Sequence, residues 1–207
     1  MPSSHYNYNV FINCPFDKDY VDLFHSIVFA VQDCGFVARC ALERGDSGET
    51  RIEKILRIIS ECKYGIHDIS RTELDRKSKL PRFNMPLELG IFLGAKQFGF
   101  RNQKQKQCLI LDRQRYRFQK FCSDIAGQDI EEHKNSPRKA IHVVRNWFGT
   151  LTAGNTVLPG GTMIYKRYKA FQKELPVYCE PLLLKPEELI FNDYTVFIEE
   201  WLRANEQ

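Results

Sequence analysis

Hydrophobic residues in the first half of the chain alternate between two kinds of spacing. Four short apolar runs are typical of buried strands, and between them apolar residues recur every three or four positions, as in amphipathic helices. This alternation predicts a parallel sheet covered by helices on both faces. The predicted strands are Val10–Asn13, Phe36–Leu42, Tyr64–Asp68 and Cys108–Asp112, and the predicted helices span about 17–34, 50–62 and 84–99.

Residues at the ends of these helices carry boundary signals. Gly35 follows the first helix and predicts its C-terminal end. Asp46 and Glu49 have the spacing of a capping box before the second helix. Asn84 opens the third helix, whose first turn tolerates Pro86.

The second half of the chain is predominantly helical in pattern. Apolar spacing predicts helices over 115–127, 136–149, 163–175 and 192–204, and the first two end at glycines. No internal repeat or low-complexity linker divides the chain. We therefore predict one domain over residues 1–207, with a core of about 9–112 and a helical elaboration of about 113–207. The fold class is α/β, a flavodoxin-like doubly wound parallel sheet with a helical C-terminal extension.

Composition narrows the classes of protein. The 207 residues carry a net charge of +4, which suits an anionic ligand but does not imply a specific nucleic-acid partner. No apolar run is long enough to span a membrane and no secretory signal is recognisable, so we expect a cytoplasmic protein without membrane attachment. The seven cysteines form no C-x-x-C pair and the five histidines are scattered, which favours buried reduced thiols and no metal site.

The chemistry is expected at the carboxyl ends of the strands, where open parallel sheets bind their ligands. Four connecting segments and the start of the helix at Asn84 converge on this edge, where helix N–H groups favour anions. The four segments are Asn13–Asp17, Leu42–Gly48, Asp68–Arg71 and Asp112–Arg115.

Glu88 is the principal candidate for a reactive group. It lies four residues after Asn84, on the same face of the helix, and the helix dipole is expected to keep it ionised. A carboxylate there could hold ribose hydroxyls, offset an oxocarbenium charge or attack an anomeric carbon. The structural alternatives are a solvated helix carboxylate for Glu88 and turn-capping roles for Asp68 and Asn13.

Three segments resemble known families. VFINCPFDKDY, at 10–20, resembles the opening strand and loop of TIR (Toll/interleukin receptor) domains. FNMPLELGIFLGAKQFG, at 83–99, resembles the N-x-x-x-E-L-G-x-x-x-G segment of bacterial TIR-like nucleotide-binding proteins and the helix that carries the catalytic Glu of nucleoside deoxyribosyltransferases. YGIHDISR, at 64–71, looks like the strand that ends in Asp in both. The likeness covers roughly residues 9–112, about half of the chain.

The resemblance implies that Glu88 acts on an N-glycosidic bond. TIR enzymes release nicotinamide from NAD by hydrolysis or cyclisation, with NAD as substrate and no further cofactor, whereas deoxyribosyltransferases exchange bases on deoxyribose. By resemblance, Asn13 and Phe16 line the ligand's entrance, Asp68 meets a sugar hydroxyl and Asn84 supports Glu88. Bacterial TIR-like proteins often serve antiphage defence, which implies self-association or a partner protein from the defence system.

Two differences from the TIR pattern leave other functions open. The chain continues well beyond the usual length of a TIR domain, and its first loop reads N-C-P-F, which looks closer to deoxyribosyltransferases. A nucleoside deoxyribosyltransferase or nucleotide hydrolase is therefore one alternative, and a non-catalytic nucleotide-sensing or self-assembling module is another. The basic segments Arg71–Arg82 and Lys104–Arg117 suit phosphate recognition, an interaction face or plain solvated surface. Residues 123–133, with Asp124 and Asp129, are expected as a lid or as a helix end.

Overall fold

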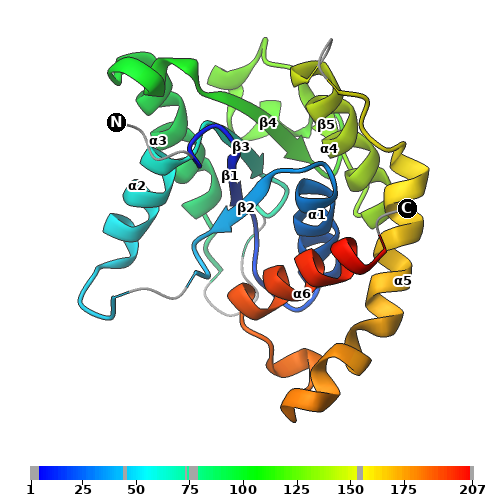
Figure 1. Ribbon diagram of the computed structural model, residues 1–207. Coiled ribbons are helices and arrows are strands. Elements are labelled where there is room, and N and C mark those ends of the chain that lie inside the picture. Colours follow the sequence, from blue (N-terminus) through cyan, green and yellow to red (C-terminus); the bar gives the residue numbers. More distant parts are fainter. Residues whose placement is uncertain (1–4, 44–45, 73, 75–78, 153–155, 206–207) are drawn as a thin grey trace.

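A five-stranded sheet forms the centre of the molecule (Figure 1). The structure, a computed structural model, describes residues 5–43, 46–72, 74, 79–152 and 156–205. All neighbouring strands are parallel, in the order β2-β1-β3-β4-β5, which is the flavodoxin-like order. The parallel sheet and the four predicted strands are thereby confirmed. The strands are β1 (Asn9–Asn13), β2 (Val37–Cys40), β3 (Tyr64–Asp68), β4 (Gln107–Asp112) and β5 (Ile130–Glu132).

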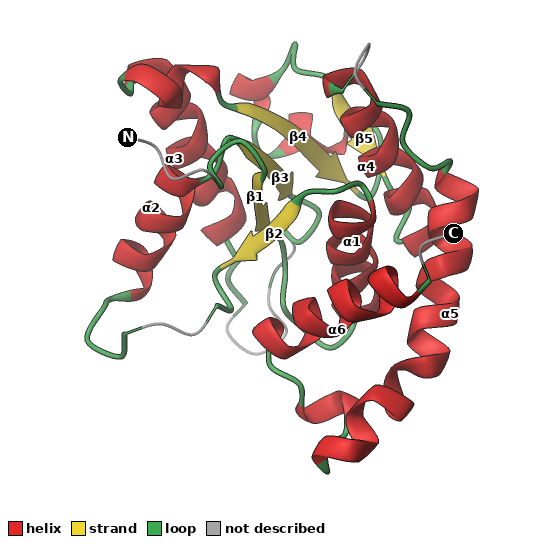
Figure 2. Ribbon diagram, viewed as in Figure 1, coloured by secondary structure: helices red, strands yellow, loops and turns green. Residues whose placement is uncertain are grey.

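Helices cover both faces of the sheet (Figure 2). Side chains of β1 alternate between the faces, so Val10 and Ile12 pack with α1 (Val21–Asp33), whereas Phe11 joins the opposite core. That second core includes Phe92 of α3 (Asn84–Phe98) and three isoleucines of α2 (Arg51–Glu61), which are Ile55, Ile58 and Ile59. The helix α4 (Pro137–Leu151) lies beside α1. The predicted two-faced arrangement is confirmed.

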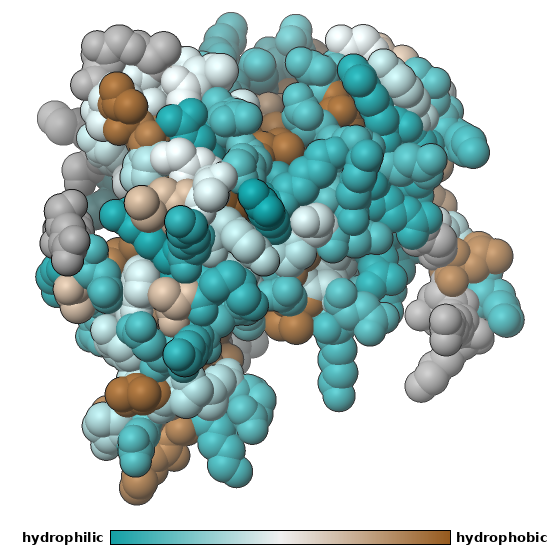
Figure 3. Space-filling model, turned by 90° about the vertical axis from the view of Figure 1, so that its right-hand side faces the viewer, coloured by the Kyte–Doolittle hydropathy of each residue, from teal (hydrophilic) through white to brown (hydrophobic). Residues whose placement is uncertain are grey.

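The C-terminal half of the chain adds a further layer of helices outside α1. The helices α5 (Gly161–Cys179) and α6 (Phe191–Ala204) pack against α1. Phe29 of α1 illustrates the contact, because its ring centroid lies 5.5 Å from that of Phe171 and 6.0 Å from that of Trp201. The outward side of this layer is largely hydrophilic (Figure 3). The helix α1 is consequently enclosed between the sheet and the C-terminal helices.

The helix boundaries agree with the sequence signals in one case and differ in another. Gly35 follows α1 with φ +84°, a conformation that favours glycine, so the predicted helix end is confirmed. The capping box predicted at Asp46 and Glu49 is wrong. Thr50 caps α2, and its side chain and that of Glu53 satisfy each other's backbone N–H groups.

The helix predicted over 115–127 is wrong as well. Tyr116 has φ +62°, which interrupts the helical pattern, and only two short 3-10 helices follow, η2 (Arg117–Lys120) and η3 (Ser123–Ile125). Residues 130–132 form β5, paired with β4, so this part of the expected lid segment belongs to the sheet. The other short 3-10 helices are η1 (Arg101–Gln105), η4 (Glu180–Leu182) and η5 (Pro186–Glu188).

Three further features of the fold concern the cysteines, the longest helices and possible metal ligands. All seven cysteines are free, and five are buried, which confirms the interpretation of most of them as buried thiols. Within the described ranges, no helix is both long and apolar enough to cross a membrane. Among the same residues, no group of His, Cys, Asp or Glu side chains has the arrangement of a metal site.

Candidate functional site

Side chains of β1 and β3 alternate between the two faces of the sheet. The polar residues at the carboxyl edge are therefore divided between these faces. Asn13 and His67 point to the α3 side, because the Asn13 amide contacts α3 and the His67 ring packs against Phe92. Asp68, one residue after His67, points to the α1 side. The site residues predicted together at this edge thus belong to opposite faces of the sheet.

Glu88 is a buried carboxylate in the second turn of α3. Only 6% of the residue is exposed, and no described residue donates a hydrogen bond to it or forms an ion pair with it. Burial raises the pKa of Glu88 to about 7, and the positive charge of Arg51 opposes this rise. Burial thus opposes the ionised form that the helix dipole is expected to favour. A carboxylate that changes charge near neutral pH is typical of functional sites.

Asn13 positions the start of α3. Its Nδ2 donates to the carbonyl oxygen of Met85 at 2.8 Å and lies 3.1 Å from Nδ1 of His67. Burial and the nearby charge of Lys106 lower the pKa of His67 to about 3, so the ring is neutral and Nδ1 can accept. Both hydrogens of the Asn13 amide are thereby used within the protein. Its observed contacts hold the first turn of α3 and leave no free N–H donor on the amide for a ligand.

Asp68 is enclosed in a network on the α1 side. Its Oδ1 accepts from the backbone N–H of Ser70 at 2.7 Å, and its Oδ2 accepts from the Tyr20 hydroxyl. Nε2 of His133 lies 2.9 Å from the same Oδ2. Nδ1 of His133 accepts a hydrogen bond from the backbone N–H of Asn135 at 3.0 Å.

The ionisation of Asp68 follows from this network. Burial alone would raise the pKa of Asp68, but the contacts from His133, Ser70 and Tyr20 outweigh burial and lower it. The side chain is fully buried and therefore has no surface for the sugar hydroxyl that the resemblance assigns to it. In this structure Asp68 joins the β1–α1 connection, β3 and the segment after β5.

Cys14, the residue after β1, is buried, and the charges of both carboxylates act on it. Burial raises the pKa of its thiol well above the ordinary value, and the negative charges of Asp68, Cys40, Glu88 and Asp17 raise it further. The charges of Asp68 and Glu88 therefore both influence the end of β1. The sequence indicated only a buried thiol here, because nothing in its spacing shows which charges surround it.

No family model, curated protein or solved structure matches this chain. The chemical interpretation accordingly rests on the geometry of the site. Glu88 combines burial, the absence of a partner among the described residues and a position at the ligand-binding edge of a parallel sheet. Arg51, which begins α2, is exposed and close enough to Glu88 to affect its pKa. It adds a positive charge that the sequence patterns did not single out.

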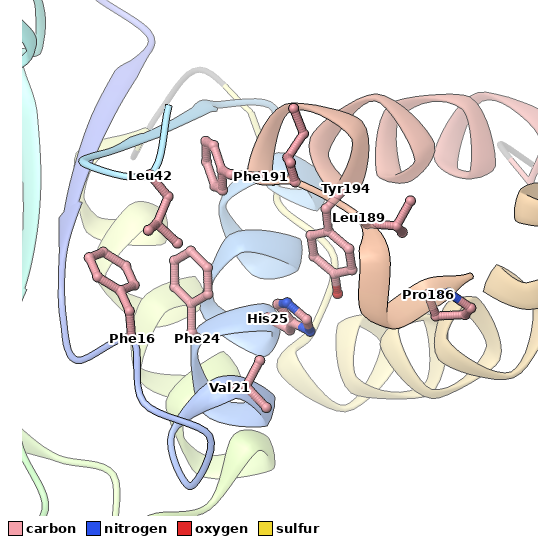
Figure 4. Close-up of a pocket in the computed structure, with 10 residues that line it drawn as sticks. Phe16, Val21, Phe24, His25, Leu42, Pro186, Leu189, Phe191 and Tyr194 are labelled. Atoms are coloured by element: carbon pink, nitrogen blue, oxygen red, sulfur yellow. The ribbon is translucent and has the colours of Figure 1, made fainter. Parts of the chain in front are cut away.

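The remaining predicted site residues are Asn84 and Phe16. Asn84 is the exposed first residue of α3, and within the described part of the chain it makes no hydrogen bond to Glu88. Phe16 is half-buried in the β1–α1 connection and meets Phe24 edge to face at 5.3 Å. Phe16 lines a cavity on the α1 side of the sheet, shown in Figure 4.

The two basic segments contain structural as well as surface charges. Nζ of Lys106 donates to the carbonyl oxygens of Ile59 and Cys62, and Arg117 holds Asp112 at 2.8 Å. These two cations therefore stabilise the fold. Residues 73 and 75–78 of the segment Arg71–Arg82 lie outside the described residues. Asp124 and Asp129, on the expected lid, are exposed.

Proposed function

We propose that this protein cleaves the N-glycosidic bond of a nucleotide, with NAD as the favoured substrate and Glu88 as the catalytic carboxylate. The observation that carries the proposal is the burial of Glu88 without a hydrogen-bond or ion-pair partner among the described residues. A carboxylate fixed only for structural reasons would gain stability from a cation or donor, whereas this one is kept free at a considerable cost of desolvation.

The proposed reaction uses the ionised form of Glu88. The bond between the anomeric carbon and the pyridinium nitrogen breaks, and its electron pair leaves with the base as neutral nicotinamide. The negative charge of Glu88 offsets the positive charge that develops on the ribose ring. Water then adds to the anomeric carbon and loses a proton, which yields ADP-ribose. Arg51, at the start of α2, supplies positive charge for the phosphates.

The resemblance of residues 9–112 to TIR-like proteins supports NAD as the substrate and a role in antiphage defence. It equally supports activation through self-association or a partner protein, and we expect the protein to act in the cytoplasm. Base exchange on deoxynucleosides is the alternative use of the same carboxylate, favoured by the N-C-P-F sequence of the first loop.

The decisive experiment incubates the purified protein with NAD, and separately with a deoxynucleoside and a second free base, at several protein concentrations. Chromatography would detect release of nicotinamide or exchange of the base. Glu88→Gln is expected to lower kcat by about 10²-fold or more, because the amide keeps the shape but loses the charge. Glu131→Gln, at an exposed position of β5, serves as the matched control and should retain full activity. Turnover by Glu88→Gln at more than half of the wild-type rate would refute the assignment.

A further inference from the structure

An open apolar groove lies between the last two helices, on the outer surface of the molecule. Its volume is about 700 Å³, and it is bounded by the C-terminal end of α5, by η4 and by one side of α6. In Figure 1 it lies beside the orange end of α5. Its walls include Val177, Leu182 and Val196, and its only charged lining residues are Asp193 and Glu200. Ligand pockets measure about 300–1,000 Å³, so this groove has room for several side chains of a partner.

Apolar side chains of the groove are exposed to water. Val177 is 65% exposed, Leu182 61% and Val196 49%. Figure 3 shows hydrophobic side chains at the lower end of the molecule, where this groove lies. Contiguous exposed apolar surface is typical of sites that contact another molecule.

Leu183, beside the groove, is more exposed than any of its walls. It follows η4 with φ +55°, at a position where glycine is common, and its side chain is 93% exposed. Neither the turn nor the core of this chain therefore requires a leucine here. Its neighbours Leu182 and Leu184 both line the groove, so the three leucines form one apolar run on the surface. Such runs are unfavourable in water unless they serve a function.

The segment that forms the groove is acidic, although the whole chain has a net charge of +4. Residues 180–200, which include η4 and most of α6, contain six acidic residues and a single lysine. None of these six carboxylates forms an ion pair with a described residue. Two of them, Asp193 and Glu200, line the groove itself. The charge of this surface is therefore complementary to a basic partner.

We propose that this groove binds an amphipathic helix of a partner protein, with apolar residues on one face and lysine or arginine along its edges. The apolar face of such a helix enters a groove between two helices and covers the exposed valine and leucine side chains. Its basic edges meet Asp193 and Glu200. Two copies of this chain placed groove to groove would bring like charges together, and an anionic membrane surface would be repelled in the same way. Binding is measured directly, so the proposal stands or falls independently of catalysis by Glu88.

The experiment titrates the intact protein with a synthetic helical peptide and follows binding by isothermal titration calorimetry. The peptide has leucines at positions i, i+3, i+4 and i+7 and lysines elsewhere. We expect saturable binding, which the double variant Val177→Asn/Val196→Asn weakens by at least about tenfold because it removes apolar surface without adding charge. The matched control is Ile52→Asn/Leu56→Asn, which changes two exposed apolar residues of α2 and should bind as the wild type does.

A charge reversal tests the acidic side of the groove. Glu200→Lys should weaken binding of the lysine peptide and strengthen binding of a counterpart that carries glutamates in place of the lysines. Glu131→Lys, at an exposed position of β5, is the control and should leave both affinities unchanged at about 0.15 M salt, where distant charges are screened.

Sedimentation velocity without peptide distinguishes a partner protein from a second copy of this chain. Equal oligomeric states of the wild type and Val177→Asn/Val196→Asn support the proposal, because the groove is then not used between copies. A wild-type oligomer that dissociates in this double variant overturns it. The proposal is also overturned if the double variant binds the lysine peptide like the wild type, or if Glu200→Lys binds the two peptides as the wild type does.

Discussion

At the scale of single residues, the proposed chemistry and the burial of Glu88 oppose each other. Catalysis requires the carboxylate, whereas burial raises the pKa to about 7 and favours the neutral acid. We therefore expect kcat/KM for nicotinamide release to rise with pH and to level off above about 7. A pH–rate profile between about pH 5 and 9 checks this. Activity that falls over the same range would mean that Glu88 acts in its protonated form.

The same pKa predicts an effect on stability. The pKa of Glu88 rises from 4.5 to about 7 on folding, so below pH 4.5 the side chain is neutral in both states. Between pH 4.5 and about 7 the unfolded chain loses the proton that the folded protein keeps, and folding becomes less favourable. The cost reaches about 3 kcal/mol above pH 7, at about 1.4 kcal/mol for each tenfold change in proton affinity.

Glu88→Gln should therefore exceed the wild type in unfolding free energy by a margin that grows with pH. We expect urea unfolding at pH 8 to show an advantage larger by about 3 kcal/mol than the one at pH 4.5. Glu131→Gln, at its exposed position, should show no such growth. Equal margins at the two pH values would mean that Glu88 is not desolvated in the folded protein.

At the scale of secondary-structure elements, Asp68 connects three segments that are distant in sequence. It accepts hydrogen bonds from the Tyr20 hydroxyl at the start of α1 and from the Ser70 N–H after β3, and its Oδ2 lies 2.9 Å from the His133 imidazole after β5. Asp68→Asn removes the charge and misplaces a donor, so we expect the unfolding free energy to fall by at least about 2 kcal/mol. Urea unfolding measures this, with exposed Asp124→Asn as control. If Asp68 instead served a substrate hydroxyl, the variant would lower kcat and keep the stability of the wild type.

The sequence specifies some elements well because local pattern and tertiary environment agree. The strands β1, β3 and β4 and the helix α3 each show the spacing that their buried faces require. The strand β5 could not be predicted, since Ile130–Glu132 has a single apolar residue and is defined by its pairing with β4. The false helix at 115–127 has aromatic residues at helical spacing. Phe118 and Phe121, however, pack in a cluster with Ile69 and Leu89 from other elements, and Tyr116 is exposed.

The candidate site, too, can be predicted from the sequence only in part. The position of Glu88 at the sheet edge follows from strand–helix alternation, so the sequence predicts it. Its raised pKa does not follow, because it results from burial in the folded protein, which the spacing of residues does not show. The surroundings of Asp68 could not be predicted for a related reason. A strand-end Asp can face either side of the sheet, and its partners Tyr20 and His133 carry no recognisable spacing.

At the scale of the whole molecule, α1 connects the sheet with the outer layer of C-terminal helices. One face of α1 packs on the sheet through the core that contains Val10 and Ile12, and the other contacts α5 and α6. Phe29, which is fully buried, sits among Phe171 and Trp201 on that outer side. Removing the outer helices would expose this surface of α1 to water, which disfavours a state with the sheet folded and the helices unfolded.

We therefore predict that the described part of the chain unfolds as one cooperative unit. Trp147 and Trp201 lie on α4 and α6, so their fluorescence reports the helical side, whereas far-ultraviolet circular dichroism also reports α2 and α3. The two urea transitions should coincide. Phe171→Ala should shift both midpoints together, with a loss of about 3–5 kcal/mol, because Phe171 is fully buried. Phe98→Ala, at a residue that is 80% exposed, should change the stability by less than about 0.5 kcal/mol. A fluorescence transition that moves in Phe171→Ala while part of the dichroism signal keeps its midpoint would show that the sheet and the C-terminal helices are separate folding units.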